Sequence, residues 1–224
     1  MVRSERLMKR DFEIKEVKPG IFLFQFKHHY DMCMHFMRYQ EFYESASPKF
    51  RGKEFDIFTF MRWYSLKYGK GSFTYPNDWN GFNIPGNIIF DMWNQHLIPD
   101  KNIYDYEMFM AWKECSAKAE GKKFYIIGVV KGNSALKHEI AHGMFYLDPE
   151  YKKETTKLVK ALSPEIRKNI NDTLKKLGYT PKVYVDETQA YMATGLTESF
   201  GKPDYLKDEQ KAFKACFSKF SRKK

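Results

Sequence analysis

Apolar residues recur at two spacings along the chain, and each spacing predicts a different kind of element. Alternating positions on both sides of Lys18-Pro19-Gly20 predict a β-hairpin over Phe12–Lys27, because Pro-Gly favours a tight turn. Lys123–Lys131 is rich in β-branched and aromatic residues and predicts the clearest strand. Recurrence every three or four positions predicts helices over Asp31–Ser45, Phe55–Tyr68, Ile88–His96, Tyr104–Glu120, from Asn133 or Ser134 to Leu147, Glu150–Leu162, from the capping Ser163 to Gly178, from the capping Asp186 to Gly195, and Tyr205–Phe220.

Two segments between these elements predict connections. Gly71–Gly86 contains glycine, proline, asparagine and aspartate at a density typical of a loop. Val183–Val185 fits either a short strand or an extended link. The predicted fold class is therefore α+β, mainly helical with a small sheet. We expect an N-terminal α+β lobe over residues 1–120 and a second lobe over residues 121–224, or one continuous domain.

Composition narrows the class of protein. Of the 224 residues, 43% are hydrophobic and 29% are charged, which is typical of a globular chain and not of a disordered one. No run approaches the roughly 18 apolar residues of a transmembrane helix, and Met1–Arg10 lacks the apolar core of a secretory signal. The three cysteines are widely spaced, so no disulfide framework is expected. Together these features predict a cytoplasmic location, with export by a route that uses no cleaved signal as the alternative.

The formal net charge of +10 attracts polyanions without selecting one of them. The basic residues are spread along the whole chain, with a modest cluster near its end at Lys214, Lys219, Arg222, Lys223 and Lys224. Because no nucleic-acid-binding motif accompanies this charge, a solvated basic surface explains it better than a nucleic-acid partner.

The strongest chemical signal is His138-Glu139-Ile140-Ala141-His142, an H-E-x-x-H motif on a predicted helix. Residues four apart lie one turn above each other on the same helical face, so the two imidazoles can bind one metal ion. Glu139 is rotated by about 100° from His138, which places it to act as general base on water held by the metal. The alternative is a surface helix with two satisfied histidines, but the apolar residues around the motif favour burial.

A catalytic zinc site usually has three protein ligands and one water, so a third ligand is needed. Asp148 stands where the metzincin pattern H-E-x-x-H-x-x-G-x-x-H has its last ligand, but that pattern needs glycine where this chain has Phe145. Glu187 lies further downstream, in Asp186-Glu187-Thr188-Gln189-Ala190-Tyr191, at the start of another predicted helix. It is the preferred candidate.

The two motifs, with a strand before the first of them, resemble the gluzincin group of zincin metallopeptidases. In that group a glutamate on a second helix, well downstream of H-E-x-x-H, completes the zinc site. The resemblance implies that His138, His142 and Glu187 bind one Zn²⁺ per chain and that Glu139 is the catalytic base. Upstream of Glu120 no family resemblance is found.

Thermolysin-like members of the group have aspartate where this chain has Tyr191. On a helix, Tyr191 shares a face with Glu187, so it either donates a hydrogen bond to the oxyanion of a reaction intermediate or packs as a core ring. The aspartate of those members braces a zinc-bound histidine, and here Asp186 is the candidate for that contact.

The resemblance also predicts the function and the partners. It implies a zincin-like fold whose sheet has an edge strand, Phe124–Val130, before the active-site helix, although a fully buried strand is the alternative. The expected activity is zinc-dependent hydrolysis of a peptide or protein substrate. The alternatives are a non-catalytic zincin-like binding or regulatory module and a basic nucleic-acid-binding protein.

Overall fold

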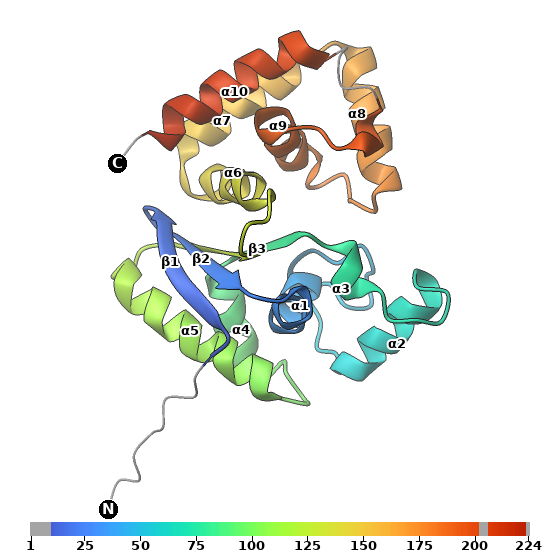
Figure 1. Ribbon diagram of the computed structural model, residues 1–224, viewed down its shortest axis with the longest axis vertical. Helices are drawn as coiled ribbons and strands as arrows, with labels where there is room; N and C mark the ends of the chain where they lie inside the picture. Colours follow the sequence, from blue (N-terminus) through green and yellow to red (C-terminus); the bar gives the residue numbers. More distant parts are fainter. Residues whose placement is uncertain (1–9, 202–205, 223–224) are drawn as a thin grey trace, which may run out of the picture. The chain divides into compact units, whose positions relative to one another are not determined.

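The computed structural model describes residues 10–201 and 206–222 and forms two compact units (Figure 1). The first comprises residues up to Val17 together with Phe22–Asn133, and the second comprises Lys18–Ile21 and the chain from Ser134 onward. The mainly helical α+β fold class is confirmed. Three expectations lie outside the described residues: the absence of a signal sequence over most of Met1–Arg10, the start of the last helix at Tyr205, and the final two lysines of the basic cluster.

The first unit contains a four-stranded sheet with the strand order β1-β2-β4-β3. Its elements are β1 (Phe12–Lys18), β2 (Ile21–Phe26), α1 (His29–Glu44), α2 (Ile57–Lys67), α3 (Tyr75–Asp78), β3 (Gly81–Pro85), α4 (Asn87–Asn94), α5 (Ile103–Ala119) and β4 (Tyr125–Val130). The predicted hairpin is confirmed as β1 and β2. Strands β3 and β4 run antiparallel, with Gly81 opposite Val129 and Pro85 opposite Tyr125.

Two expectations about this sheet are wrong. The strand before the helix that carries the H-E-x-x-H motif, β4, is not an edge strand, because β2 and β3 lie on its two sides. Its backbone is therefore used within the sheet, so an extended substrate cannot be added to it. The cause is β3 itself, in a segment expected to be a loop. Phe82 and Ile84 alternate there with less buried positions, and their burial outweighs the turn-forming residues around them.

Strand β4 also explains why the division into units differs from the expected one. The boundary falls between Asn133 and Ser134 rather than after Glu120, because β4 pairs with β3 of the first unit. Helix α1 packs closely on β4: a Cβ atom on Gly128 would lie 2.4 Å from the ring of Phe36. None of the described helices is both long and apolar enough to cross a membrane.

The second unit is a helical assembly around α9 (Figure 1). Its elements are α6 (Leu136–Leu147), α7 (Pro149–Ala161), α8 (Pro164–Lys176), α9 (Tyr184–Thr194), the short 3₁₀ helix η1 (Glu198–Phe200) and α10 (Lys207–Ser221). Helix α9 packs against α6, α7, α8 and α10. Its residues Glu187–Ala193 are buried apart from Tyr191, so the polar side chains among them need partners inside the unit.

The helix starts in this unit agree only partly with the sequence. Ser163 caps α8, as predicted, by accepting a hydrogen bond from the amide of Ile166. The predicted cap of α6 at Asn133 or Ser134 is wrong, since Ala135 precedes its first turn and no side chain caps it. The expected strand or link at Val183–Val185 is also wrong. Helix α9 already begins at Tyr184, which places Asp186 in its first turn instead of at its cap.

A close approach fixes the position of α6 within the unit. Gly143, next to His142, has no side chain, and a Cβ atom there would lie 2.7 Å from Cδ1 of Ile21. Ile21, the first residue of β2, belongs to the Lys18–Ile21 segment of this unit, and it is almost fully buried. The glycine therefore allows this segment to pack directly on the helix that carries both histidines.

Candidate metal centre

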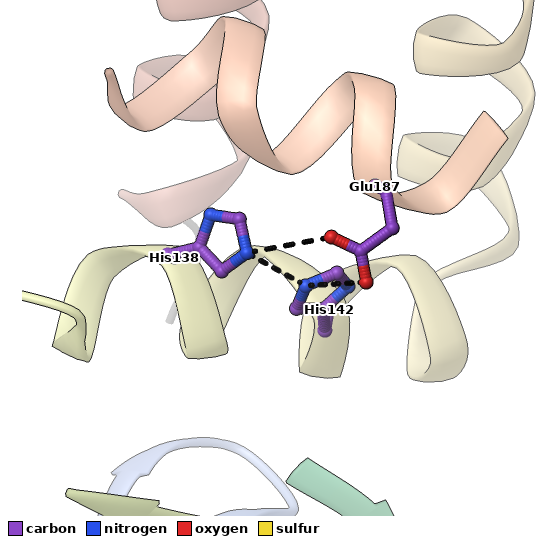
Figure 2. A group of neighbouring side chains, drawn as sticks. All are labelled: His138, His142 and Glu187. Atoms are coloured by element: carbon purple, nitrogen blue, oxygen red, sulfur yellow. Dashed lines mark hydrogen bonds and ion pairs between the residues drawn. The ribbon is translucent and has the colours of Figure 1, made fainter. Parts of the chain in front are cut away.

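His138 and His142 lie one turn apart on α6 and point at a common place (Figure 2). Their Nε2 atoms are 3.1 Å apart. The side chain of His142 is buried, whereas that of His138 keeps 17% of its surface exposed. The pair therefore has one ring inside the protein and one that reaches solvent.

Glu187 faces both rings from the first turn of α9 (Figure 2). Its Oε2 atom lies 3.7 Å from Nε2 of His138, and its Oε1 atom lies 3.7 Å from Nε2 of His142. The ligand atoms of these three residues all lie within 4.8 Å of one another. Because α6 and α9 pack together, two motifs far apart in the sequence meet at one point.

The three side chains fit a tetrahedral metal ion. Zinc with metal–nitrogen bonds of about 2.0–2.1 Å keeps its ligand atoms about 3.3 Å apart, close to the separations of 3.1 and 3.7 Å found here. Oε2 of Glu187 is buried without a hydrogen-bond partner. A buried carboxylate oxygen in that state is costly unless a cation is close to it.

Asp186 holds His142 from behind. Its Oδ1 atom lies 2.9 Å from Nδ1 of His142, so the contact expected between this carboxylate and a ligating histidine is present. An imidazole that donates its Nδ1 proton to a carboxylate has a free electron pair on Nε2. Asp186 thus directs the metal-binding nitrogen of His142 towards His138 and Glu187.

The charge of the site favours a cation. Burial by itself lowers the pKa of His142, but the carboxylates of Asp186 and Glu187 outweigh this effect and hold the pKa of the imidazole well above its usual value. The charge of Glu139 acts in the same direction. Three carboxylates around two imidazoles therefore create a negative potential that a divalent ion would neutralise.

Glu139 is buried on α6 and stands outside the group of three residues with metal-ligand geometry. Its charge acts on His142 and also on the hydroxyls of Tyr179 and Tyr191, so its carboxylate lies close to the site. A proton acceptor beside the metal must lie within hydrogen-bond reach of the bound water. The catalytic role of Glu139 stays a prediction.

Tyr191 and a residue that the sequence did not reveal, Tyr179, border the centre. The ring of Tyr191 lies 4.5 Å from that of His138, and its hydroxyl is 3.4 Å from the hydroxyl of Tyr179. Burial, reinforced by the charge of Glu187, raises the pKa of Tyr191 to about 12 and that of Tyr179 well above its usual value. The ring of Tyr191 is therefore packed, which is one of the two expected features, and its hydroxyl contacts that of Tyr179. The role of Tyr191 at an oxyanion stays a prediction. Tyr179 follows Gly178 in the turn after α8 and has no sequence signal of its own.

Asp148, the alternative third ligand, has a different task. Its carboxylate accepts hydrogen bonds from the amides of Glu150 and Tyr151 and caps α7. Among the residues that the structure describes, the only group with metal-ligand geometry is His138, His142 and Glu187. The metzincin-like arrangement is therefore disfavoured.

Comparison with known proteins adds no further constraint. No protein family, no curated protein and no solved structure matches the chain. The function must therefore be inferred from the chemistry of the site.

Proposed function

We propose that the protein is a zinc-dependent peptidase whose metal is bound by His138, His142 and Glu187. The observation that carries the proposal is the buried Glu187 carboxylate: each of its oxygens faces one imidazole nitrogen at 3.7 Å, and Oε2 has no hydrogen-bond partner. The resemblance of the two motifs to gluzincins supports the same assignment.

The donor set supports zinc and an open site. Two imidazoles with one carboxylate are ligands that zinc accepts, whereas calcium and magnesium prefer oxygen alone. Structural zinc sites are closed by four protein ligands, and catalytic sites use three. The group found among the described residues has three members, so a zinc ion held by them would have a fourth ligand position for water or substrate. This favours an enzyme over a purely structural or regulatory zinc site.

Each residue around the metal then has a chemical role. Bound zinc would polarise the scissile carbonyl and lower the pKa of water to about 7. Glu139 accepts a proton from the attacking water and returns it to the leaving amine. Tyrosine hydroxyls are protonated at neutral pH, and the raised pKa values of Tyr191 and Tyr179 keep these two in that state. The two hydroxyls lie 3.4 Å apart, so one donates to the other and the second can donate to the developing oxyanion.

The proposed substrate is a peptide or a protein, and the proposed location is the cytoplasm. A nucleic-acid partner has less support, because the net charge of +10 is its main argument.

A peptide library analysed by mass spectrometry tests the proposal. The full chain loaded with zinc should cleave peptide bonds, a chelator should abolish the cleavage, and added zinc should restore it. Absence of cleavage by a protein that demonstrably binds zinc would favour the non-catalytic alternative.

A further inference from the structure

Three buried or half-buried side chains behind the metal centre form a chain of hydrogen bonds that ends on His142. The hydroxyl of Tyr151 on α7 donates to Oε1 of Gln189 on α9 over 2.7 Å. Nε2 of Gln189 donates to Oδ1 of Asp186 over 2.9 Å. That same oxygen accepts from Nδ1 of His142, also over 2.9 Å. The chain thus joins α7, α9 and α6, and its last member is a metal ligand.

Gln189 is the centre of this chain. The residue is fully buried, and its Nε2 atom also donates to the backbone oxygen of Ala141 over 3.3 Å. Its orientation follows from these partners: two acceptors, on Ala141 and Asp186, face the amide nitrogen, and the Tyr151 hydroxyl faces the amide oxygen. A flipped amide would place its oxygen against both acceptors. The side chain therefore has one favourable orientation, and each of its polar atoms is used.

Asp186 depends on this support. Its side chain is 26% exposed, whereas that of His142 is 3% exposed, so water can compete for the carboxylate. Burial alone does not fix a partly exposed side chain in the first turn of a helix. The hydrogen bond from Gln189 comes from the buried side and restrains Oδ1 where His142 needs it.

We propose that Tyr151 and Gln189 are positioning residues of the metal centre: Tyr151 holds Gln189, and Gln189 holds Asp186 against His142. This inference rests on the metal site of the proposed function. Outer partners of metal-bound histidines fix the orientation of the ring and strengthen the ligand. Tyr151, which touches none of the three ligands directly in this chain of bonds, would thus tune the affinity for the metal from a separate helix.

The test is a double-mutant cycle on the full chain, with the Zn²⁺ dissociation constant measured by competition with a chelating dye. Gln189→Met should weaken zinc binding by about 10-fold or more, and Tyr151→Phe should weaken it less. In the Gln189→Met background, Tyr151→Phe should have no further effect, because its influence passes through Gln189. The absorption spectrum of bound Co²⁺ should change in the same variants, which reports on ligand geometry rather than on stability.

Thr155→Val is the matched control. The Thr155 hydroxyl donates to the backbone oxygen of Tyr151 over 2.8 Å and is fully buried on the same helix, but its hydrogen bonds go to the backbone of α7 and not to Gln189. This variant should lower the melting temperature of the metal-free protein and leave zinc affinity and the Co²⁺ spectrum unchanged.

The outcomes separate this inference from the proposed function. If the wild type binds zinc and Gln189→Met binds it equally well, the inference is overturned and the metal site stands. Independent, additive effects of the two substitutions, or an equal loss in Thr155→Val, would also overturn it. If the wild type binds no zinc, the proposed function itself is refuted, because it requires the metal site. Should Tyr151→Phe fail to fold, Gln189→Met alone still decides the matter.

Discussion

Nε2 of His138 and Nε2 of His142 face each other at 3.1 Å, with the Glu187 carboxylate 3.7 Å from each. Two nitrogen electron pairs at this distance repel each other unless a proton or a metal ion lies between them. Asp186 occupies Nδ1 of His142, so the ring presents its other nitrogen to this point. The arrangement therefore favours a cation shared by the three side chains.

Glu139→Gln should retain zinc and lose hydrolysis. The amide has almost the same shape as the carboxylate but cannot accept a proton, and loss of a general base costs roughly 10²–10⁴-fold in rate. Zinc content and peptide cleavage measured on the same preparation check this. If the variant lost zinc instead, Glu139 would be a ligand and the assigned roles would be wrong.

Asp148→Ala should lower stability and leave zinc binding intact. The variant removes the cap of α7, which costs about 1 kcal/mol, but it removes no atom from the group of three ligands. Thermal unfolding of the variant measures its stability, and zinc titration measures its affinity for the metal. Loss of zinc at unchanged stability would instead support the metzincin-like site.

How far the sequence predicts this site depends on the range of the interactions. His138 and His142 follow from helical spacing, which is a local rule, whereas Glu187 follows only from the resemblance of a second motif to gluzincins. The contacts of Tyr179 with Tyr191 and of Tyr151 with Gln189 join different segments of the chain, and no local spacing encodes them. Strand β3 escapes prediction for the same reason, because only its pairing with β4 and the burial of its apolar side chains make Gly81–Pro85 a strand.

A buried carboxyl in the first unit predicts a pH dependence that is independent of the metal. Burial raises the pKa of Glu41 above its usual value, and hydrogen bonds from Ser45 and from the Tyr75 hydroxyl, 2.9 Å away, counter this only in part. The folded state therefore binds the proton more tightly than the unfolded state. The stabilisation from the protonated Glu41 carboxyl is complete below the pKa of Glu41 in the unfolded chain. It is lost as the pH rises through the pKa of Glu41 in the folded protein.

Glu41→Gln should remove this loss of stability at higher pH, because glutamine does not ionise. Relative to the wild type, the variant should gain stability as the pH rises above the unfolded pKa of glutamate, about 4.3. Urea unfolding followed by tryptophan fluorescence reports on the correct unit, since all four tryptophans lie between Phe22 and Asn133. A difference between variant and wild type that stays constant with pH would contradict the assignment.

Gly143 and Ile21 should be energetically coupled. Gly143→Ala gains about 1 kcal/mol of helix propensity, but its Cβ would lie 2.7 Å from Cδ1 of Ile21, and such overpacking costs about 1–3 kcal/mol. Ile21→Val removes that methyl group and alone costs about 0.5–1.5 kcal/mol. In the Gly143→Ala background this cost should shrink or reverse. Additive free energies of unfolding would show that the contact is not tight.

The central claim is tested most directly by the metal content of tag-free protein, measured by elemental mass spectrometry for the wild type, His142→Ala and Glu187→Ala. We predict about one zinc per wild-type chain, lost in both variants. Wild-type protein without zinc, even after reconstitution, would contradict the claim, because His138, His142 and Glu187 would then not form a zinc site.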